Sequence, residues 1–368
     1  MEKGYLVLQD GQVFEGVRFG APGDTMGELV FTTGMGSYIE TLTDPSYAGQ
    51  IVLHTYPLIG NVGMIRSDFE GPCAVKGYVV REWCRHPSNF RTDCDLDTFL
   101  KEEGIPGLWG VDTRQLTRIL REQGVMNAAI CTRVPGNLDA LRSYAVTGMV
   151  EAVTCKEPAS FPAEGEERFR VALLDYGAKQ NIHRELQSRG CTVTVLPAST
   201  SAEEVLALNP DGIMLANGPG DPAQCHFQAA QIGKLLGKRP LFGICLGHQL
   251  TALAVGGRTY KLKYGHRGAN QPVREIDTPM FPQQTQGRTY ITSQNHGYVV
   301  DPDSVRAGRM SFVNANDGTC EGMDYPGLDA FTVQFHPEAH GGPMDTAFLF
   351  DRFLSLMELR HTQKGGER

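Results

Sequence analysis

The stretch PLFGICLGHQLTALAVGG, residues 240–257, predicts a strand, a sharp turn and a helix in direct succession. Residues 240–244 are typical of a short buried strand, and residues 246–255 of a helix that ends at a glycine pair. The glycines on either side of Cys245 permit the tight strand-to-helix turn of a nucleophile elbow. Cys245 would then lie at a helix N-terminus, where the dipole and free N–H groups favour thiolate. We interpret Cys245 as a nucleophile; the alternative is a small buried hydrophobe, the commoner role of a free cysteine.

A second motif, His336-Pro337-Glu338, follows an apolar and β-branched run at residues 331–335. That run predicts a strand that stops at Pro337, since proline cannot donate to a strand ladder. His336 and Glu338 would then emerge at the carboxyl end of a strand, which is the ligand-binding edge of an open α/β sheet. A histidine can take and return a proton while a nearby carboxylate fixes its tautomer. An isolated loop histidine is weak evidence, but together with the cysteine elbow it predicts a Cys-His-Glu triad.

A third motif, Asn217-Gly218-Pro219-Gly220-Asp221-Pro222, follows the strand-like run at residues 211–216. Glycines in such a loop let the backbone approach a ligand closely and point an N–H group at a developing oxyanion. We expect one donor from Gly220 or its neighbour and a second from the amide of Leu246. The alternative is an ordinary Gly/Pro turn, which the same composition would form.

Strand-like and helix-like segments alternate from residue 169 onward, beginning with a strand at 169–174, a helix at 178–188 and a strand at 192–196. This alternation predicts an α/β domain with a doubly wound, mostly parallel sheet. The first 150 residues instead contain β-hairpin signals and a few helices, which indicates a mixed, β-rich domain. We therefore divide the chain into an N-terminal domain at 1–150, a polar, proline-containing linker at 151–168, the α/β domain at 169–360 and a frayed tail at 361–368.

Length and composition fit an enzyme subunit of two domains. The chain has 368 residues, of which 41% are hydrophobic, and its formal charge of −8 argues against nucleic-acid or membrane-surface binding. No apolar stretch approaches membrane-spanning length, and the nine cysteines show no pairing rhythm, which predicts reduced thiols in a cytoplasm. No Gly-x-x-x-x-Gly-Lys-Ser/Thr loop occurs, so ATP chemistry is expected on another subunit.

A metal site is not expected. His336 and His340 are four residues apart, a spacing that could bind zinc on a helix. Pro337 and the glycines at 341–342 argue against a regular helix there.

The cysteine elbow, the Asn-Gly-Pro-Gly-Asp loop and the His-Pro-Glu motif stand in the order found in class I (triad) glutamine amidotransferases, which residues 169–358 resemble. The first 150 residues narrow the resemblance to the small chains of carbamoyl-phosphate synthase. Four segments of this region resemble those small chains: FTTGM (31–35), LTDPSYAGQIV (42–52), YPLIGNVG (56–63) and GVDTRQLT (110–117).

This resemblance implies a glutaminase subunit that converts L-glutamine to glutamate and ammonia through a thioester on Cys245. Ammonia would pass to a large chain, which makes carbamoyl phosphate from bicarbonate and ATP for arginine and pyrimidine biosynthesis. The resemblance implies no cofactor in this chain, with ATP and Mg on the large chain. The expected partners are that large chain, in a heterodimer or a higher assembly, and L-glutamine, with no nucleic acid and no membrane.

The resemblance also implies residue roles. Cys245, His336 and Glu338 would be catalytic. Because Ser46 lies in the first domain, the glutamine pocket is expected near the domain boundary. The residues expected to contact glutamine are Ser46, Gly218, Gly220, Leu246, Gln249, Asn295, Gly297 and Tyr298. From residues alone, the alternative for 295–297 is a simple turn.

Three departures from the family pattern leave the triad intact. Gly36-Ser37 stands where Thr-Gly is usual, Tyr298 replaces a phenylalanine, and His340 occupies a common serine position. Two rival functions remain at this level: a stand-alone cysteine hydrolase of γ-glutamyl substrates, and a silent scaffold that binds a synthetase.

Overall fold

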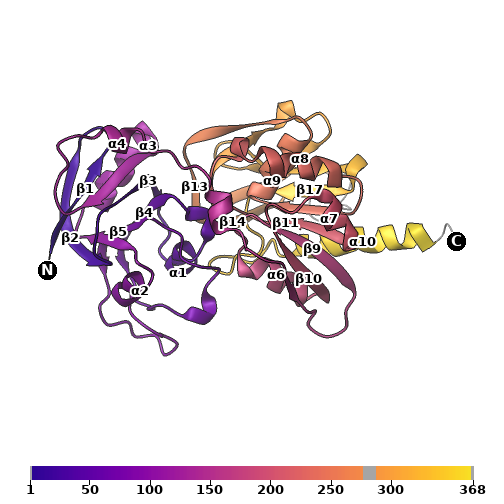
Figure 1. Ribbon diagram of the computed structural model, residues 1–368, viewed down its shortest axis with the longest axis horizontal. Coiled ribbons are helices and arrows are strands. Elements are labelled where there is room, and N and C mark those ends of the chain that lie inside the picture. Colours follow the sequence, from indigo (N-terminus) through magenta and orange to yellow (C-terminus); the bar gives the residue numbers. More distant parts are fainter. Residues whose placement is uncertain (1, 277–286, 366–368) are drawn as a thin grey trace. The chain divides into compact units, whose positions relative to one another are not determined.

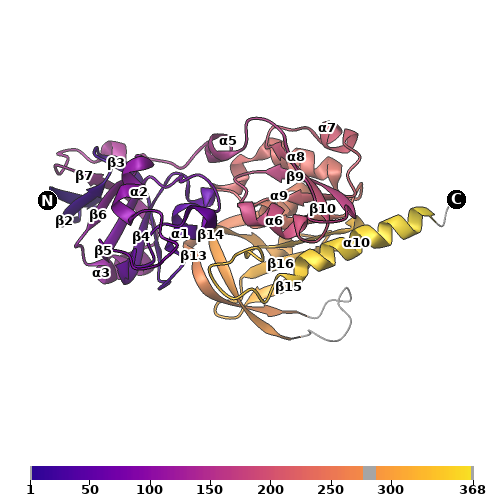
Figure 2. The ribbon, with the colours of Figure 1, turned by 90° about the horizontal axis from the view of Figure 1, so that it is seen from below.

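The computed structural model describes residues 2–276 and 287–365 and divides the chain into two compact units (Figures 1 and 2). The first unit comprises Met1–Met149 and Lys263–Gly268, and the second comprises Val150–Leu262 and Ala269–Arg368. The short segment 263–268 belongs with the first unit, where the Val125 amide donates to the Lys263 carbonyl at 2.9 Å.

Seven strands of the first unit close into a barrel. Their order around the barrel is β1-β2-β6-β5-β4-β3-β7. The turn between the first two strands contains Gly11 at φ +96°, as the sequence signal for a hairpin requires. The strands are β1 (Lys3–Leu8), β2 (Val13–Gly20), β3 (Thr25–Thr32), β4 (Gln50–Ile59), β5 (Gly77–Trp83), β6 (Pro106–Trp109) and β7 (Met126–Cys131).

Short helices cover the barrel. The Asp112 side chain accepts a hydrogen bond from the Gln115 amide at 2.9 Å and so caps α3, which ends at Gly124. Leu116 and Leu120 of this helix are fully buried in the barrel core. The helices of the first unit are α1 (Tyr38–Leu42), α2 (Leu96–Glu102), α3 (Thr113–Gln123) and α4 (Asp139–Arg142), and α5 (Met149–Val153) follows at its end.

The second unit is built on a ten-stranded sheet in the order β14-β13-β15-β16-β17-β12-β11-β9-β10-β8. The strands from β17 to β10 are parallel to one another, and antiparallel strands extend both edges. The strands are β8 (Ala159–Phe161), β9 (Phe169–Asp175), β10 (Cys191–Pro197), β11 (Gly212–Leu215), β12 (Leu241–Ile244), β13 (Arg258–Glu275), β14 (Thr289–Asp301), β15 (Arg309–Asn314), β16 (Cys320–Tyr325) and β17 (Ala330–Val333).

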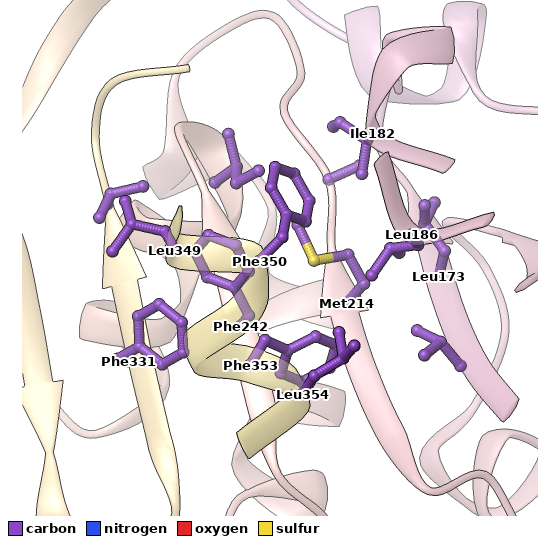
Figure 3. Packing of buried hydrophobic residues seen from close by; sticks show 14 of the residues in the cluster. Leu173, Ile182, Leu186, Met214, Phe242, Phe331, Leu349, Phe350, Phe353 and Leu354 are labelled. Atoms are coloured by element: carbon purple, nitrogen blue, oxygen red, sulfur yellow. The ribbon is translucent and has the colours of Figure 1, made fainter. Parts of the chain in front are cut away.

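Helices pack on both faces of this sheet, which confirms the predicted doubly wound, mostly parallel fold. On one face, α6 (Gln180–Gln187) and α10 (Phe348–Gly365) bury Phe242, Phe350 and Phe353 (Figure 3). On the other face lie α7 (Ala202–Ala207), α8 (His226–Leu235) and α9 (Leu246–Ala254). Because successive strand residues alternate, Met214 joins the first cluster and its neighbours Ile213 and Leu215 join the second.

Two boundaries differ from the sequence expectation. The stretch expected to be a linker, 151–168, contains the end of α5 and the strand β8, which pairs antiparallel with β10. The stretch expected to be a frayed tail, 361–368, begins inside α10, where His361 Nε2 lies 2.9 Å from Asp211 Oδ1. Residues 366–368 lie outside the described part of the chain.

Within residues 2–276 and 287–365, every helix is too short or too polar to cross a membrane.

Candidate active site

Cys245 occupies a strained turn between β12 and α9. Its backbone adopts φ 52° and ψ −103°, a left-handed conformation that side chains rarely tolerate. The flanking glycines allow the chain to turn there. A Cβ on Gly247 would lie 2.5 Å from the Leu215 carbonyl oxygen, and one on Gly243 would lie 2.9 Å from Gly247 itself. The structure therefore gives Cys245 the elbow geometry that the sequence predicts.

His336 and Glu338 lie directly beyond the end of β17. His336 Nδ1 is 2.7 Å from Glu338 Oε1, and both side chains are buried. The His336 amide donates to the Ser293 carbonyl at 3.0 Å, which fixes this loop against β14. Because a carboxylate can only accept, Nδ1 carries a proton and Nε2 is the nitrogen available for proton transfer.

A lysine completes the charge arrangement. Lys179 Nζ lies 3.8 Å from Glu338 Oε1, and both groups are buried. Burial and Lys179 act to lower the pKa of His336, but the charge of Glu338 and hydrogen bonds with Cys245 and Glu338 raise it to about 9. Burial alone would raise the pKa of Glu338, but His336 and Lys179 hold it below its ordinary value. The imidazole is therefore held as a cation beside the cysteine at neutral pH.

The Cys245 thiol has two neighbours. Its Sγ lies 3.8 Å from the Asn295 carbonyl oxygen, within reach of a weak S–H donor bond. His336 Nε2 makes no well-formed hydrogen bond within the described residues, although Cys245 is close enough to raise the pKa of the ring. Hydrogen bonds between catalytic groups are commonly long before substrate binds, and this pair fits that pattern.

The loop after β11 lies against the start of α9. A Cβ on Gly218 would approach Leu246 Cδ2 to 2.8 Å, so the loop and the helix N-terminus are in contact. The Gly247 amide donates to the Ala216 carbonyl at 3.1 Å and holds them together. Leu246 is the first residue of α9, whose first amides have no partner within the helix. Gly220 has φ +92°. The two expected oxyanion donors thus come from adjoining segments.

Four of the predicted glutamine contacts, Gln249, Asn295, Gly297 and Tyr298, lie on α9 and β14, the two segments next to the nucleophile. Gln249 Nε2 donates to the Tyr298 carbonyl at 2.8 Å and to Gln334 Oε1 at 2.9 Å. Asn295 faces the Cys245 sulfur through its carbonyl. Residues 295–298, including Gly297, belong to β14, so this segment is a strand and not the isolated turn that was the alternative.

Ser46 lies in the first unit, in the 3-10 turn Pro45–Tyr47. It is buried, and its amide donates to Asp44 Oδ1 at 2.9 Å. Its role as a glutamine contact stays a prediction.

The structure shows the surroundings of the three departures. Ser37 adopts φ 62°, a conformation that glycine usually supplies. Tyr298 meets Gln249 through its backbone carbonyl, so exchange of its ring for a phenylalanine leaves that contact unchanged. His340 Nε2 lies 3.2 Å from Glu185 Oε1 on the exposed side of the unit.

Sequence reasoning missed Lys179. Its amide donates to Asn217 Oδ1 at 3.1 Å, which joins the loop after β9 to the loop after β11. A lysine before a helix does not by itself indicate a functional site. Lys179 comes close to Glu338 only because the sheet places the ends of their strands near one another.

Comparisons with known proteins agree on one family. Residues 172–356 match the family described as glutamine amidotransferase class-I, and residues 6–130 match the carbamoyl-phosphate synthase small chain, CPSase domain.

Curated relatives match over nearly their whole length. The carbamoyl phosphate synthase small chain of Bacillus thuringiensis subsp. konkukian is 48% identical to this chain, over 99% of this chain and 98% of the relative. The small chain of Listeria monocytogenes serotype 4b is also 48% identical, over 97% of each chain. The small chain of Syntrophotalea carbinolica is 46% identical, over 99% of this chain and 100% of the relative.

Proposed function

The chain belongs to the family of carbamoyl phosphate synthase small chains, and from that premise we propose how its own residues hydrolyse glutamine. Its second unit is a class I glutamine amidotransferase domain, and its activity is the hydrolysis of glutamine. The observation that best supports the residue assignment is the 2.7 Å contact between His336 and Glu338, beside a cysteine in an elbow.

In the first half of the reaction, the Cys245 thiolate attacks the side-chain amide carbon of glutamine. A C–S bond forms, and the oxyanion is held by backbone N–H groups of Leu246 and of Gly220 or its neighbour. His336, as an imidazolium oriented by Glu338, gives its proton to the amide nitrogen. The C–N bond then breaks, ammonia leaves, and a γ-glutamyl thioester remains on Cys245.

In the second half, His336 is neutral and removes a proton from water. The water oxygen bonds to the thioester carbon, the C–S bond breaks and glutamate is released. The proton on His336 balances the thiolate that leaves, so the cysteine–imidazolium pair is restored. An amide is a poor electrophile, which is why a covalent path with a positioned acid suits this chemistry.

The substrate is proposed to lie against Gly218, Gln249, Asn295, Gly297 and Tyr298 of the second unit. The hydrogen bond from Gln249 Nε2 to the Tyr298 carbonyl supports the assignment of these two residues to one site.

The ammonia is proposed to pass to a large chain, in a heterodimer or a higher assembly of heterodimers. The names of the relatives support a partner of this kind, since a small chain implies a large one. The large chain would use ATP and Mg to make carbamoyl phosphate from bicarbonate, for arginine and pyrimidine biosynthesis in the cytoplasm. This chain itself would need no cofactor.

Glutaminase turnover tests the proposal. We expect weak activity of the chain alone, and a strong increase when a large chain, ATP and bicarbonate are added. Equal rates in both conditions would identify a stand-alone hydrolase. No turnover in either condition would identify a scaffold.

A further inference from the structure

A buried carboxylate outside the triad lies behind the proposed glutamine site. Glu321 on β16 has no exposed surface. It accepts hydrogen bonds from two side-chain amides, from Gln294 Nε2 to Oε2 at 3.0 Å and from Asn314 Nδ2 to Oε1 at 3.0 Å. A buried carboxylate is costly unless its oxygens are hydrogen-bonded, so this arrangement is specific.

The carboxylate orients the next two groups. Because Glu321 can only accept, the Gln294 amide must turn its nitrogen toward it and its oxygen toward His296, whose Nε2 is 3.0 Å away. The other ring nitrogen of His296, Nδ1, lies 2.9 Å from the Tyr298 carbonyl, which can also only accept. Because both partners are acceptors, His296 bonds to both only as an imidazolium, and it then links the side chain set by Glu321 to the backbone of β14.

These hydrogen bonds lead from Glu321 to the proposed substrate site. The Tyr298 carbonyl that receives His296 also receives Gln249 Nε2 at 2.8 Å. Three residues earlier on the same strand, the Asn295 carbonyl faces Cys245 Sγ. A displacement of the Tyr298 carbonyl would therefore move Gln249 and the strand segment beside the nucleophile together.

We propose that Glu321 is a positioning residue for glutamine: acting through Gln294 and His296, it fixes the Tyr298 carbonyl and with it residues 295–298 of β14. The inference rests on the proposed glutaminase function. Such a group supports backbone that holds substrate and transition state alike, so its loss should raise KM and leave kcat nearly unchanged.

The test is Glu321→Ala in the full chain assembled with a large chain. We expect the glutamine KM of the glutaminase reaction to rise about tenfold, the scale of one lost buried hydrogen bond, with kcat changed less than about threefold. Protection of Cys245 by glutamine against alkylation with iodoacetamide gives a second readout of site occupancy, and the glutamine concentration that protects half of the protein should rise by a similar factor. An unchanged KM and unchanged protection would overturn the proposal.

Two control variants separate positioning from loosening of the unit. Glu321→Gln keeps a hydrogen-bonding partner for Gln294 and should stay within about threefold of the parent KM. Asp324→Asn, on the same strand, removes another buried carboxylate, one that pairs with Arg352 at 2.9 Å, and should lower the unfolding temperature without changing KM. The proposal would be refuted if Glu321→Gln raised the glutamine KM as much as Glu321→Ala does. It would also be refuted if Asp324→Asn raised the KM by the same factor.

A double-mutant cycle completes the design. Gln294→Ala should raise KM as much as Glu321→Ala, and the double variant should be no worse than either, because both act through one path. Fully additive effects would overturn the proposal. A parent complex that does not hydrolyse glutamine would instead refute the proposed function, whereas an active parent with a normal Glu321→Ala variant refutes only this inference.

Discussion

Two buried histidines, His54 in the barrel and His336 beyond the carboxyl end of β17, have pKa values shifted in opposite directions. His54 has no exposed surface and lies 2.9 Å from both the Gly34 carbonyl and the Tyr78 hydroxyl, and burial lowers its pKa to about 4. His336 is just as buried, but Glu338 and Cys245 raise its pKa to about 9. Burial by itself discharges an imidazole, and a carboxylate at 2.7 Å reverses that outcome. A buried histidine is thus informative about chemistry only together with its charged partner.

The largest effect on activity is expected from removal of Cys245, the nucleophile beside His336. Cys245→Ser should reduce glutaminase kcat by roughly 10^4-fold or more, because a serine hydroxyl is not ionised beside the imidazolium. Ammonia release measured with the large chain present checks it. The unfolding temperature should change little, and ammonia release at the parent rate would exclude the thioester path.

Matched replacements of the two histidines test their roles directly. His336→Asn should lower kcat by about 10^3-fold with a small effect on stability, since general acid–base catalysis is lost. His54→Asn should lower the free energy of unfolding of the barrel by about 2 kcal/mol and leave kcat within a few-fold. Steady-state kinetics and urea unfolding of both variants would show it, and the reverse pattern would contradict the comparison.

The pKa of His54 also predicts how acid affects stability. The unfolded chain binds a proton at this residue near pH 6.5, whereas the folded chain does so only near pH 4. The unfolded state therefore binds more protons between these values, and stability falls as pH drops from 6.5 to 4, by roughly 3 kcal/mol. Urea unfolding of the parent and of His54→Gln across this range isolates the contribution of His54 to the free energy of unfolding, because the variant lacks this titration. A parent and a variant with the same pH dependence would contradict it.

Loss of the carboxylate should make His336 behave more like His54. In Glu338→Gln, burial and Lys179 still lower the pKa of His336 while the charge that raises it is gone. The imidazolium would then lose its proton at lower pH, so the alkaline limb of the kcat/KM profile should move from near pH 9 toward neutrality. At pH 8 we expect kcat/KM to fall about tenfold or more. An unshifted alkaline limb would show that Glu338 does not set this pKa.

The smallest effects are expected on stability, from removal of one helix cap in each unit. Ser201 caps α7 through the Glu204 amide at 3.2 Å, and Asp112 caps α3 in the barrel. Ser201→Ala and Asp112→Ala should each cost about 1 kcal/mol. Amide hydrogen exchange should accelerate mainly in the unit that carries the change. Equal acceleration in both units after either substitution would mean that they unfold as one body.

Local sequence was sufficient for the elbow and for the His336–Glu338 pair. Both depend on neighbours in the chain: glycines that permit the turn at Cys245, and Pro337, which directly precedes the carboxylate and keeps a strand from continuing there. Helix α3 was predictable for the same reason, because its cap and its final glycine are adjacent to it.

Features that depend on strand order were beyond the sequence. Lys179 meets Glu338 because the strands lie in the order β17-β12-β11-β9, which no short segment records. Strand β8 has three residues and forms by pairing with β10, so its composition alone indicated a linker. Residues 295–298 resemble a turn locally but belong to β14, which neighbours β13 in the sheet. Closure of the barrel likewise needs β7 to pair with both β1 and β3.

The left-handed backbone at Cys245 implies a trade between durability and activity. A residue with a side chain held at φ 52° costs on the order of 1–3 kcal/mol, which the surrounding packing must supply. A glycine at this position would relax that conformation, so an inert Cys245→Gly protein should outlast the working one on heating. Selection for heat resistance alone would therefore tend to erase the very residue that makes the molecule useful.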